Sequence, residues 1–135
     1  VDRLKLRARV RFVGGVADIY PYLLSADIFL FASQEEGQGL VVLEAAGAGV
    51  PVIATDLPAL RELFDRASMT FLSVLADKRA WSQAIRECME QADRMYLQAQ
   101  LAQRIVRDHC SLDRMVSEHV VLYHRLMASY AHPSR

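Results

Sequence analysis

Residues 27–58 read DIFLFASQEEGQGLVVLEAAGAGVPVIATDLP, and the order of residue types in this stretch decides the predicted fold. Asp27–Ala32 is a compact apolar strand, and a polar loop follows at 33–38. Gly39–Ala48 is predicted as a helix of small residues, which a Gly-Val-Pro sequence ends before the strand that begins with Val52–Ala54. Strands that are apolar throughout are typical of a parallel sheet that is covered on both faces.

The same alternation of strands and helices continues on both sides of this stretch. The other predicted elements are a helical tail at Asp2–Arg9, a strand at Val10–Val13, a helix at Ile19–Leu24, a turn at Thr55–Pro58, a helix at Ala59–Phe64, a strand at Met69–Val74, and helical segments at Asp77–His109 and Leu112–Tyr130. Asp18 and Ser111 are the expected caps of the helices that follow them. Strand–helix–strand repetition predicts a doubly wound α/β fold. We expect one partial domain over residues 1–135, with the α/β portion at 10–75 and C-terminal helices at 76–130.

The length and composition limit the classes of protein to which the chain can belong. The chain has 135 residues, 53% of them hydrophobic, and a formal net charge of zero. This length suffices for one domain with a core, and the lack of a basic surplus argues against a nucleic-acid partner. Two distant cysteines make no disulfide framework, and the spacing of the four histidines, His132 among them, predicts no metal site. Without a signal peptide or a bilayer-length apolar run, a cytoplasmic location is the default expectation.

The Gly-Gln-Gly turn at 37–39, which lies between two glutamates, is the candidate binding site. Glycines let the backbone approach a ligand closely, and the helix that follows begins with unpaired N–H groups that carry a partial positive charge. A diphosphate is stabilised there without a lysine, whereas Glu36 and Glu44 can accept hydrogen bonds from sugar hydroxyls. The turn follows the carboxyl end of a strand, where open α/β sheets bind ligands. The pattern therefore predicts a nucleotide-sugar site.

Each glutamate also has a plainer explanation. Glu36 is equally well explained as a complement to the helix dipole. Glu44 interrupts the apolar run at 41–46, where a buried helix face should be apolar. Because a lone buried carboxylate is costly, we expect Glu44 to have a partner, either the hydroxyls of a ribose or an arginine from elsewhere in the chain.

Three sequences together resemble the C-terminal half of retaining GT-B glycosyltransferases of the large family 4: RFVGG at 11–15, SADIFLFASQEEGQGLVVLEAAGAGVPVIATD at 25–56, and REL at 61–63. The family pattern has two glutamates separated by seven residues, an alanine after the second, a small-residue helix and Gly-x-Pro-Val. The residues that match it here are Glu36, Glu44, Ala45, Gly49, Pro51 and Val52. The likeness is strong from Arg11 to Glu62 and weak beyond.

The resemblance implies an incomplete Rossmann-like parallel sheet of the GT-B C-terminal type, with flanking helices and a helical C-terminal tail. It implies a hexosyltransferase that moves a sugar from a nucleotide-sugar donor to a glycan or lipid-linked acceptor with retention of configuration. Glycan, lipopolysaccharide or exopolysaccharide biosynthesis is the implied setting. No cofactor and no metal is implied.

The resemblance also implies roles for single residues. Glu36, as the catalytic residue, would contact the donor-sugar hydroxyls and help to place the anomeric carbon, and Glu44 would hold the ribose. Val13 and Gly14 would lie near the base. The groups implied to face the diphosphate or the sugar belong to Gly37, Gln38, Gly39 and Leu40. Gln38 replaces an aromatic residue that is commoner in the family, which leaves the identity of the donor open.

Two parts that the family uses are not recognisable in this sequence. One is a Gly-Arg turn with a following lysine, which would neutralise the leaving diphosphate; the other is the N-terminal acceptor-binding domain. We therefore expect this chain alone to be inactive. Because the family places two further strands between Val10–Val13 and Asp27–Ala32, we expect these two segments either to pair directly or to associate loosely beside an exposed apolar edge.

Three alternatives stay open at this stage. The chain could be a noncatalytic nucleotide-sugar-binding module, an inactive fragment of a transferase, or part of a GT-B epimerase. Arg104, Arg107 and Arg114 could contact an anionic membrane at its inner face, although a solvated helix face explains them as well. The methionines of the helical half are predicted to pack between helices; they are Met89, Met95, Met115 and Met127.

Overall fold

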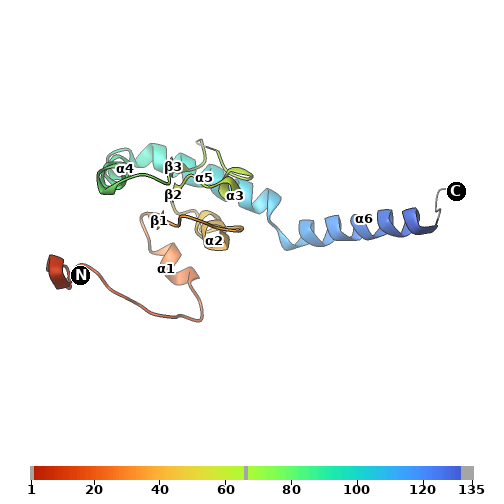
Figure 1. Ribbon diagram of the computed structural model, residues 1–135, viewed down its shortest axis with the longest axis horizontal. Coiled ribbons are helices and arrows are strands. Elements are labelled where there is room, and N and C mark those ends of the chain that lie inside the picture. Colours follow the sequence, from red (N-terminus) through yellow and green to blue (C-terminus); the bar gives the residue numbers. More distant parts are fainter. Residues whose placement is uncertain (1, 66, 132–135) are drawn as a thin grey trace.

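Three short parallel strands form the centre of the structure, in the order β1–β2–β3 (Figure 1). The computed structural model describes residues 2–65 and 67–131. The elements along the chain are the 3-10 helix η1 (Asp2–Leu4), α1 (Tyr20–Leu24), β1 (Phe29–Phe31), α2 (Leu40–Gly47), β2 (Val52–Thr55), α3 (Pro58–Arg61), β3 (Thr70–Leu72), α4 (Lys78–Glu90), α5 (Ala92–His109) and α6 (Leu112–Ala131). A parallel sheet with flanking helices and a helical tail confirms the predicted α/β class.

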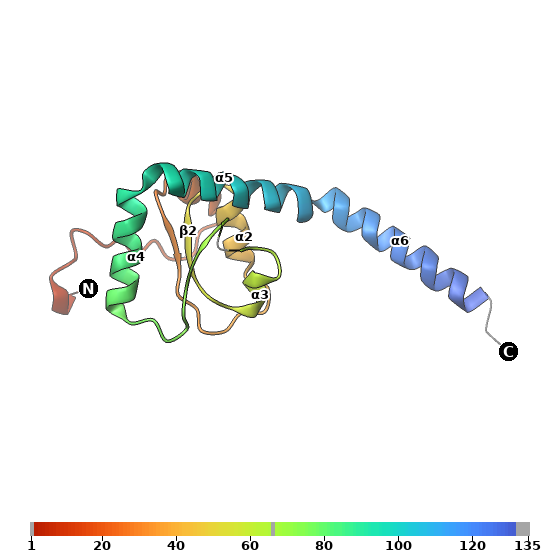
Figure 2. The same ribbon diagram turned by 90° about the horizontal axis from the view of Figure 1, so that it is seen from above.

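The central strand β2 is covered on both faces. Ile53 pairs in register with Leu30 of β1 and Thr70 of β3. Val52 and Ala54 belong to a core shared with α2 and α3, whereas Ile53 packs in a second cluster with residues of α4 and α5. Figure 2 shows α4 on one side of the strands and α2 and α3 on the other. All four residues of β2 are buried, as expected for a parallel sheet between two helical layers.

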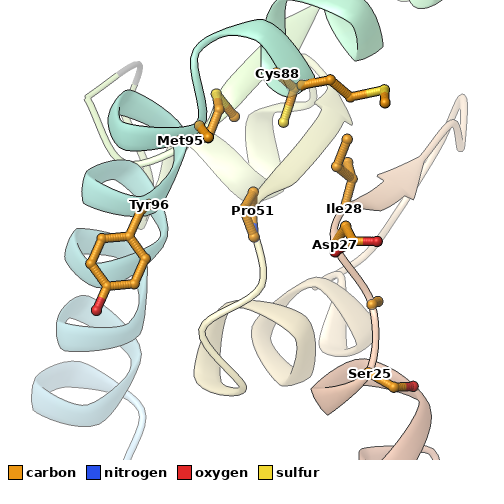
Figure 3. Close-up of a pocket in the computed structure, with 10 residues that line it drawn as sticks. Ser25, Asp27, Ile28, Pro51, Cys88, Met95 and Tyr96 are labelled. Carbon is orange, nitrogen blue, oxygen red and sulfur yellow. The ribbon is translucent and has the colours of Figure 1, made fainter.

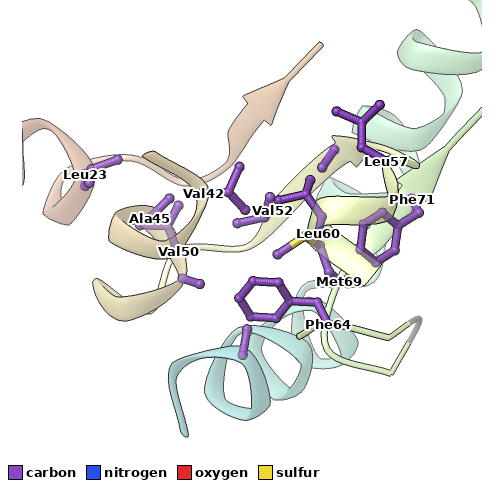
Figure 4. Close-up of a cluster of buried hydrophobic side chains, with 13 residues drawn as sticks. Leu23, Val42, Ala45, Val50, Val52, Leu57, Leu60, Phe64, Met69 and Phe71 are labelled. Carbon is purple, nitrogen blue, oxygen red and sulfur yellow. The ribbon is translucent and has the colours of Figure 1, made fainter. Parts of the chain in front are cut away.

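Small residues let α2 pack closely against its neighbours (Figure 4). Ala45 and Ala46 have no exposed surface. On the side of α5, the Gln103 side-chain amide donates a hydrogen bond of 3.0 Å to the carbonyl oxygen of Gly47. A Cβ atom added to Gly47 would lie 3.5 Å from Val106, so the small residue brings α2 into van der Waals range of α5. The predicted small-residue helix is therefore confirmed, together with the reason for its composition.

The predicted helical segment Asp77–His109 consists of two helices. The Asp77 carboxylate caps α4 by accepting hydrogen bonds from the N–H groups of Arg79 and Ala80, each at 3.0 Å. Gln91 then leaves the helical region, with φ −114° and ψ 49°, and α5 turns away from α4 (Figure 2). Because no glycine or proline occurs between residues 78 and 109, the sequence carries no signal for this break.

Helix α6 extends away from the rest of the molecule (Figures 1 and 2). The Ser111 hydroxyl accepts a hydrogen bond of 3.3 Å from the Arg114 N–H, which confirms the predicted cap. The predicted packing is confirmed for Met95, which is buried, but it is wrong for the other three methionines. Met89 is 72% exposed on α4, and Met115 and Met127 are 50% and 68% exposed on α6, because none of the described elements covers these side chains fully.

The predicted strand Val10–Val13 does not form. Residues 10–18 have no regular structure, and Phe12 is 83% exposed. A strand needs a neighbour for its backbone N–H and C=O groups, and this segment pairs with none of the described strands. Direct pairing with β1 is thus wrong, because the segment runs away from the sheet (Figure 1). The expected exposed apolar edge is present at β1, where Leu30 is 46% exposed. The predicted helix Asp2–Arg9 is likewise reduced to the single turn η1.

The remaining predicted elements are present with shorter bounds. Strand β1 spans three residues, and α3 begins at Pro58 and ends at Arg61. Asp18, the predicted cap of α1, precedes the N-cap residue Ile19 by one position, although its carboxylate does accept a hydrogen bond of 2.9 Å from the Tyr20 N–H. Within the described part of the chain, no helix combines the length and the apolar character that crossing a membrane requires.

Candidate functional site

The candidate site lies at the carboxyl ends of the strands, in the loop that joins β1 to α2. Apart from the half-buried Ser33, the loop residues are exposed up to Gln38, and Gly39 is buried where the helix begins. The Ser33 hydroxyl donates a hydrogen bond of 2.7 Å to the carbonyl oxygen of Glu35, which fixes the first turn of the loop. The sequence and the structure therefore agree on the position of the Gly-Gln-Gly turn, between a strand end and a helix start.

Glu36 lies over the glycine turn that follows it. Its carboxylate accepts a hydrogen bond of 3.1 Å from the N–H of Gly37, and its Cγ lies 3.6 Å from the position a Cβ would take at Gly39. The side chain is otherwise exposed. Because only one of its oxygens is bound to the loop backbone, the other oxygen can accept a hydrogen bond from a ligand hydroxyl, as expected of a sugar contact.

The helix start at Gly39 has unpaired backbone donors. The carbonyl oxygen of Gly39 accepts from Val42 N–H at 2.8 Å and from Leu43 N–H at 3.2 Å, and no side chain caps the helix. The N–H groups of Leu40 and Val41 precede the first intrahelical donor and stay available for a ligand. Together with the helix dipole, these donors favour an anion at this position.

Gly39 must be a glycine for two physical reasons. Its φ of 69° is left-handed, where other residues are strained. An added Cβ would also come within 2.6 Å of Leu60 Cδ2, so α3 packs directly under the turn. Gly37 has neither constraint, since nothing lies within 4 Å of an added Cβ there.

Glu44 differs from the expectation in one respect. Its side chain is exposed, and the described residues provide it with no hydrogen bond or ion pair. The expectation of a buried carboxylate that needs a protein partner is wrong, because Val42, Ala45 and Ala46 take the buried face of α2 and turn Glu44 outward. Glu44 lies about one turn into the helix, so its carboxylate is open to a ligand. Its ribose role stays a prediction.

Val13 and Gly14 are not brought to this loop. They belong to the exposed segment that runs away from the sheet before α1 (Figure 1), and an added Cβ at Gly14 would meet nothing within 4 Å. Their assignment to the donor base is carried by the family resemblance alone and stays a prediction.

An ion pair that was not predicted from the sequence holds α3 in place next to the glycine turn. The Arg61 guanidinium donates to both carboxylate oxygens of Asp56, at 2.6 and 2.8 Å, and lies 4.0 Å from the centroid of the Phe71 ring. The Asp56 hydrogen bond raises the pKa of Arg61 above its ordinary value. This pair fixes α3 against the ends of β2 and β3, and α3 in turn carries Leu60 under Gly39. The five-residue spacing of Asp56 and Arg61 across a turn was the available signal.

A cavity of about 740 Å³ lies at the opposite edge of the sheet (Figure 3). Ile28 and Pro51, which line it, precede β1 and β2, and Tyr96 lines it from α5. Burial raises the pKa of the Cys88 thiol there, so the sulfur stays protonated and is a poor nucleophile. This cavity is distant from the free N–H groups of α2 and from both glutamates, and we do not assign it as the donor site.

Metal ligands do not gather in the described part of the chain. Residues 2–65 and 67–131 contain no group of three or more His, Cys, Asp or Glu side chains that could hold an ion. His132 lies outside the described residues.

A glycine turn and an uncapped helix start at the carboxyl edge of a parallel sheet define an α/β domain that binds its ligand at this edge. Residues 1–91 match the family described as Glycosyl transferases group 1. Since the match covers more than half of the 135 residues, the chain belongs to this family. The resemblance stated on the residues Glu36 to Val52 is thereby confirmed.

One relative and two solved structures define the extent of the likeness. The O-antigen biosynthesis glycosyltransferase WclY of Escherichia coli is 39% identical over 71 residues, which are 53% of this chain and 20% of WclY. HepE of Anabaena, solved in complex with UDP-glucose, has a TM-score of 0.78 and 25% identity over 89% of this chain and 34% of HepE. The C-terminal domain of the group 1 protein LpcC of Francisella tularensis has a TM-score of 0.66 and 23% identity over 76% of this chain and 53% of that domain.

The fold is therefore that of a GT-B C-terminal domain. The chain spans about a fifth of WclY and about a third of HepE.

Proposed function

We propose that this chain is the donor-binding part of a retaining glycosyltransferase. The transferase would move a hexosyl group from a nucleotide-sugar to a glycan or lipid-linked acceptor. The observation that carries the proposal is the helix start of α2, where two free N–H groups follow a turn covered by the Glu36 carboxylate. Membership in the group 1 family supports the reaction class. The name of WclY supports a role in the synthesis of a surface polysaccharide such as O-antigen.

Binding would begin with the diphosphate at the start of α2. The N–H groups of Leu40 and Val41 would donate to its oxygens, and the dipole of the helix would stabilise its charge. Glu36, one turn of loop before the helix, would accept a hydrogen bond from a hydroxyl of the donor sugar. Glu44, exposed on the helix, would accept from the two hydroxyls of the ribose. Loss of such a paired carboxylate–diol contact lowers affinity strongly.

The transfer itself would exchange one bond for another at the anomeric carbon. The oxygen of the acceptor hydroxyl would form a bond to this carbon on the face that the leaving diphosphate vacates. The bond between the carbon and the diphosphate oxygen would break, and the hydroxyl proton would pass to the leaving phosphate. The N–H groups of α2 would stabilise the charge that develops on the diphosphate. No step needs a metal ion. Further cationic groups are expected from outside this chain, so the chain alone is expected to bind donor without transferring sugar.

Binding of nucleotides to the 135-residue chain tests this proposal. UDP and UDP-glucose are the first probes, because the related HepE was solved with UDP-glucose; GDP- and ADP-sugars complete the set. Glu44→Gln should weaken the binding of the nucleotide by at least about tenfold, since it removes one charged acceptor of the ribose hydroxyls. Glu36→Gln should keep the affinity for UDP and remove the additional affinity of UDP-glucose. Calorimetry measures both effects.

Glu90→Gln is the matched control, because Glu90 is an exposed glutamate on α4, away from the loop. It should bind as the parent does. Equal affinity of the parent and Glu44→Gln for every nucleotide would contradict the ribose role, and an equal loss of UDP and UDP-glucose in Glu36→Gln would contradict its sugar-facing role.

A second candidate function is binding without transfer. The observation that favours it is length, since this chain spans only 20% of WclY and 34% of HepE. A noncatalytic module would hold the nucleotide-sugar at the same helix start. Release of nucleoside diphosphate from the donor in the presence of a polysaccharide acceptor separates the two functions when it is measured on a polypeptide that also supplies the expected Gly-Arg turn and lysine. Only a transferase releases the diphosphate there, whereas the 135-residue chain alone is expected to release none under either function.

A further inference from the structure

A dense group of positive charges lies near the start of the chain. Five bases occupy alternate positions between residues 3 and 11, and the side chains of all five are exposed. We call this set the basic segment: Arg3, Lys5, Arg7, Arg9 and Arg11. Asp2 is the only acid beside them, so residues 2–11 carry a net charge of +4. Because the whole chain has zero formal net charge, the rest of it carries −4.

The basic segment is separated from the negatively charged remainder. Figure 1 shows the residues before α1 running away from the sheet to η1, and no residue of η1 is buried. Two backbone turns keep the bases close together, because the N–H of Lys5 donates to the carbonyl oxygen of Asp2 at 3.0 Å and the N–H of Arg9 to that of Leu6 at 2.9 Å. The segment is therefore a compact, solvated patch of positive charge.

One of the five bases is neutralised within the chain. The Arg7 guanidinium donates to both carboxylate oxygens of Asp2, with 3.1 Å for the second contact, and this hydrogen bond raises the pKa of Arg7 above its ordinary value. The described residues provide no acidic partner for the other four bases. Like charges at this density repel one another, and an anion outside the chain would relieve the repulsion.

The arginines of the C-terminal helices, which were also considered for membrane contact, differ in this respect. Arg107 forms an ion pair with Asp108 at 3.3 Å, and Arg114 forms one with Glu118 at 2.7 Å. Acids on the same helices therefore neutralise two of these three arginines. The unneutralised positive charge is denser in the basic segment than on α5 and α6.

An anionic phospholipid bilayer is the partner that fits this patch best. Clusters of about four to eight Lys or Arg residues are typical of segments that bind anionic lipid, and each base near such a surface raises the affinity about fivefold. The positions between the bases carry no acid that would oppose the attraction. Because the charges carry the attraction, it is the same whether the apolar side chains between them are covered or not.

Nucleic acid fits the patch less well. Proteins that bind single strands place aromatic side chains between their bases, and residues 3–11 contain no aromatic side chain. A long polyanion would also pass over the remainder of the chain, whose net charge is −4, whereas a flat bilayer contacts only the protruding patch.

We propose that the basic segment binds the surface of a bilayer that contains anionic phospholipid, with Arg3, Lys5, Arg9 and Arg11 against the headgroup phosphates. This contact uses no residue of the donor site and does not depend on the proposed sugar transfer. A lipid-linked acceptor, which is one of the two acceptor classes proposed above, would lie in the same surface.

Cosedimentation of the 135-residue chain with vesicles tests the proposal. Vesicles made of equal parts of phosphatidylglycerol and phosphatidylcholine are compared with vesicles of phosphatidylcholine alone. The parent should bind the anionic vesicles and not the neutral ones. The binding should fall steeply as salt is added, because exposed charges are screened beyond about 10 Å at 0.1 M salt.

A triple variant removes three unpaired bases and keeps the pair of Arg7 with Asp2. Its substitutions are Arg3→Gln, Lys5→Gln and Arg9→Gln. At about fivefold for each base, it should lower the affinity for anionic vesicles about 100-fold. Circular dichroism should show the helix content of the parent, because the three side chains are exposed.

A second triple variant is the matched control, since it removes one lysine and two arginines that are also exposed but lie on α4 and α5. Its substitutions are Lys78→Gln, Arg86→Gln and Arg104→Gln. Both variants therefore have the same net charge. The control should lower the affinity by no more than about twofold, because screened charges far from the bilayer contribute little.

Five results would overturn the proposal. The first two are a parent that binds no anionic vesicles and a parent that binds neutral vesicles equally well. The next two are an unchanged affinity in the first triple variant and an equal loss of affinity in both triple variants. The fifth is tighter binding of the parent to a single-stranded oligonucleotide than to the anionic vesicles, which would assign the patch to nucleic acid.

Discussion

Two apolar, β-rich segments of this chain end in different states, and the difference shows what a strand needs. Val52–Thr55 forms β2, with a paired strand on each side and helices on both faces. Val10–Val13 has a similar apolar content, yet it stays irregular and exposed. The composition of a segment gives it the capacity to form a strand, but only neighbours that accept its hydrogen bonds and cover its side chains make the strand stable.

The largest expected difference in stability comes from removing one side chain from each of these two segments. Ile53→Ala opens a cavity under a fully buried residue and should lower the free energy of unfolding by about 2–5 kcal/mol. Val13→Ala removes a side chain that is 43% exposed and should change the free energy of unfolding by less than about 0.5 kcal/mol. Denaturant unfolding of the two variants measures both changes. A comparable loss in the two variants would mean that residues 10–13 are packed in solution.

The two glycines of the site loop also differ in how closely other residues pack around them, and we expect a smaller difference in stability between their variants. Gly39→Ala would strain a left-handed residue and press on Leu60, and it should cost about 1–3 kcal/mol of stability. It should also displace the start of α2 and weaken nucleotide binding. Gly37→Ala, with open space around its Cβ, should leave the stability nearly unchanged. Thermal unfolding with and without UDP measures these effects, and a neutral Gly39→Ala would show that α3 does not hold the turn.

The smallest expected change in stability comes from breaking the ion pair between Asp56 and Arg61, which holds α3. Arg61→Gln removes both charged hydrogen bonds to Asp56 at a site that is about one-third exposed, so the expected loss of stability is only about 1 kcal/mol. Arg86→Gln, on the exposed face of α4, is the control and should be neutral. If α3 positions Gly39 through Leu60, Arg61→Gln should also weaken UDP binding, whereas Arg86→Gln should not. An unchanged affinity for UDP in both variants would show that the Asp56–Arg61 pair does not position the site.

The sequence predicted the stretch from Asp27 to Asp56 well because its signals are local. Each structural feature is specified by residues in the same short segment: apolar runs form the strands, a glycine takes the left-handed turn, and a proline ends the helix. The exposure of Glu44 was also readable, since Val42, Ala45 and Ala46 fall at helical spacing on one face and leave Glu44 off it. The expectation of a buried Glu44 fails because it treats residues 41–46 as one buried face, whereas a helix buries only one side of this run.

Other features depend on contacts that the sequence does not reveal. The break at Gln91 has no glycine or proline to mark it, and the failure of Val10–Val13 to form a strand follows from a missing neighbour. The apolar stripe of α6 was visible, but a stripe predicts only that something packs there, not what does. The support of Gly39 by Leu60 joins residues from two helices and could be seen only after folding.

The central claim is that the start of α2 holds the diphosphate of a nucleotide-sugar. Amide NMR of the isotope-labelled chain during a titration with UDP-glucose tests it most directly. We predict that the largest saturable shifts occur at the N–H groups of Gly39, Leu40 and Val41, and that Glu44→Gln weakens them. Shifts confined to the cavity around Cys88 and Tyr96, or no saturable shift at these three groups, would contradict the account.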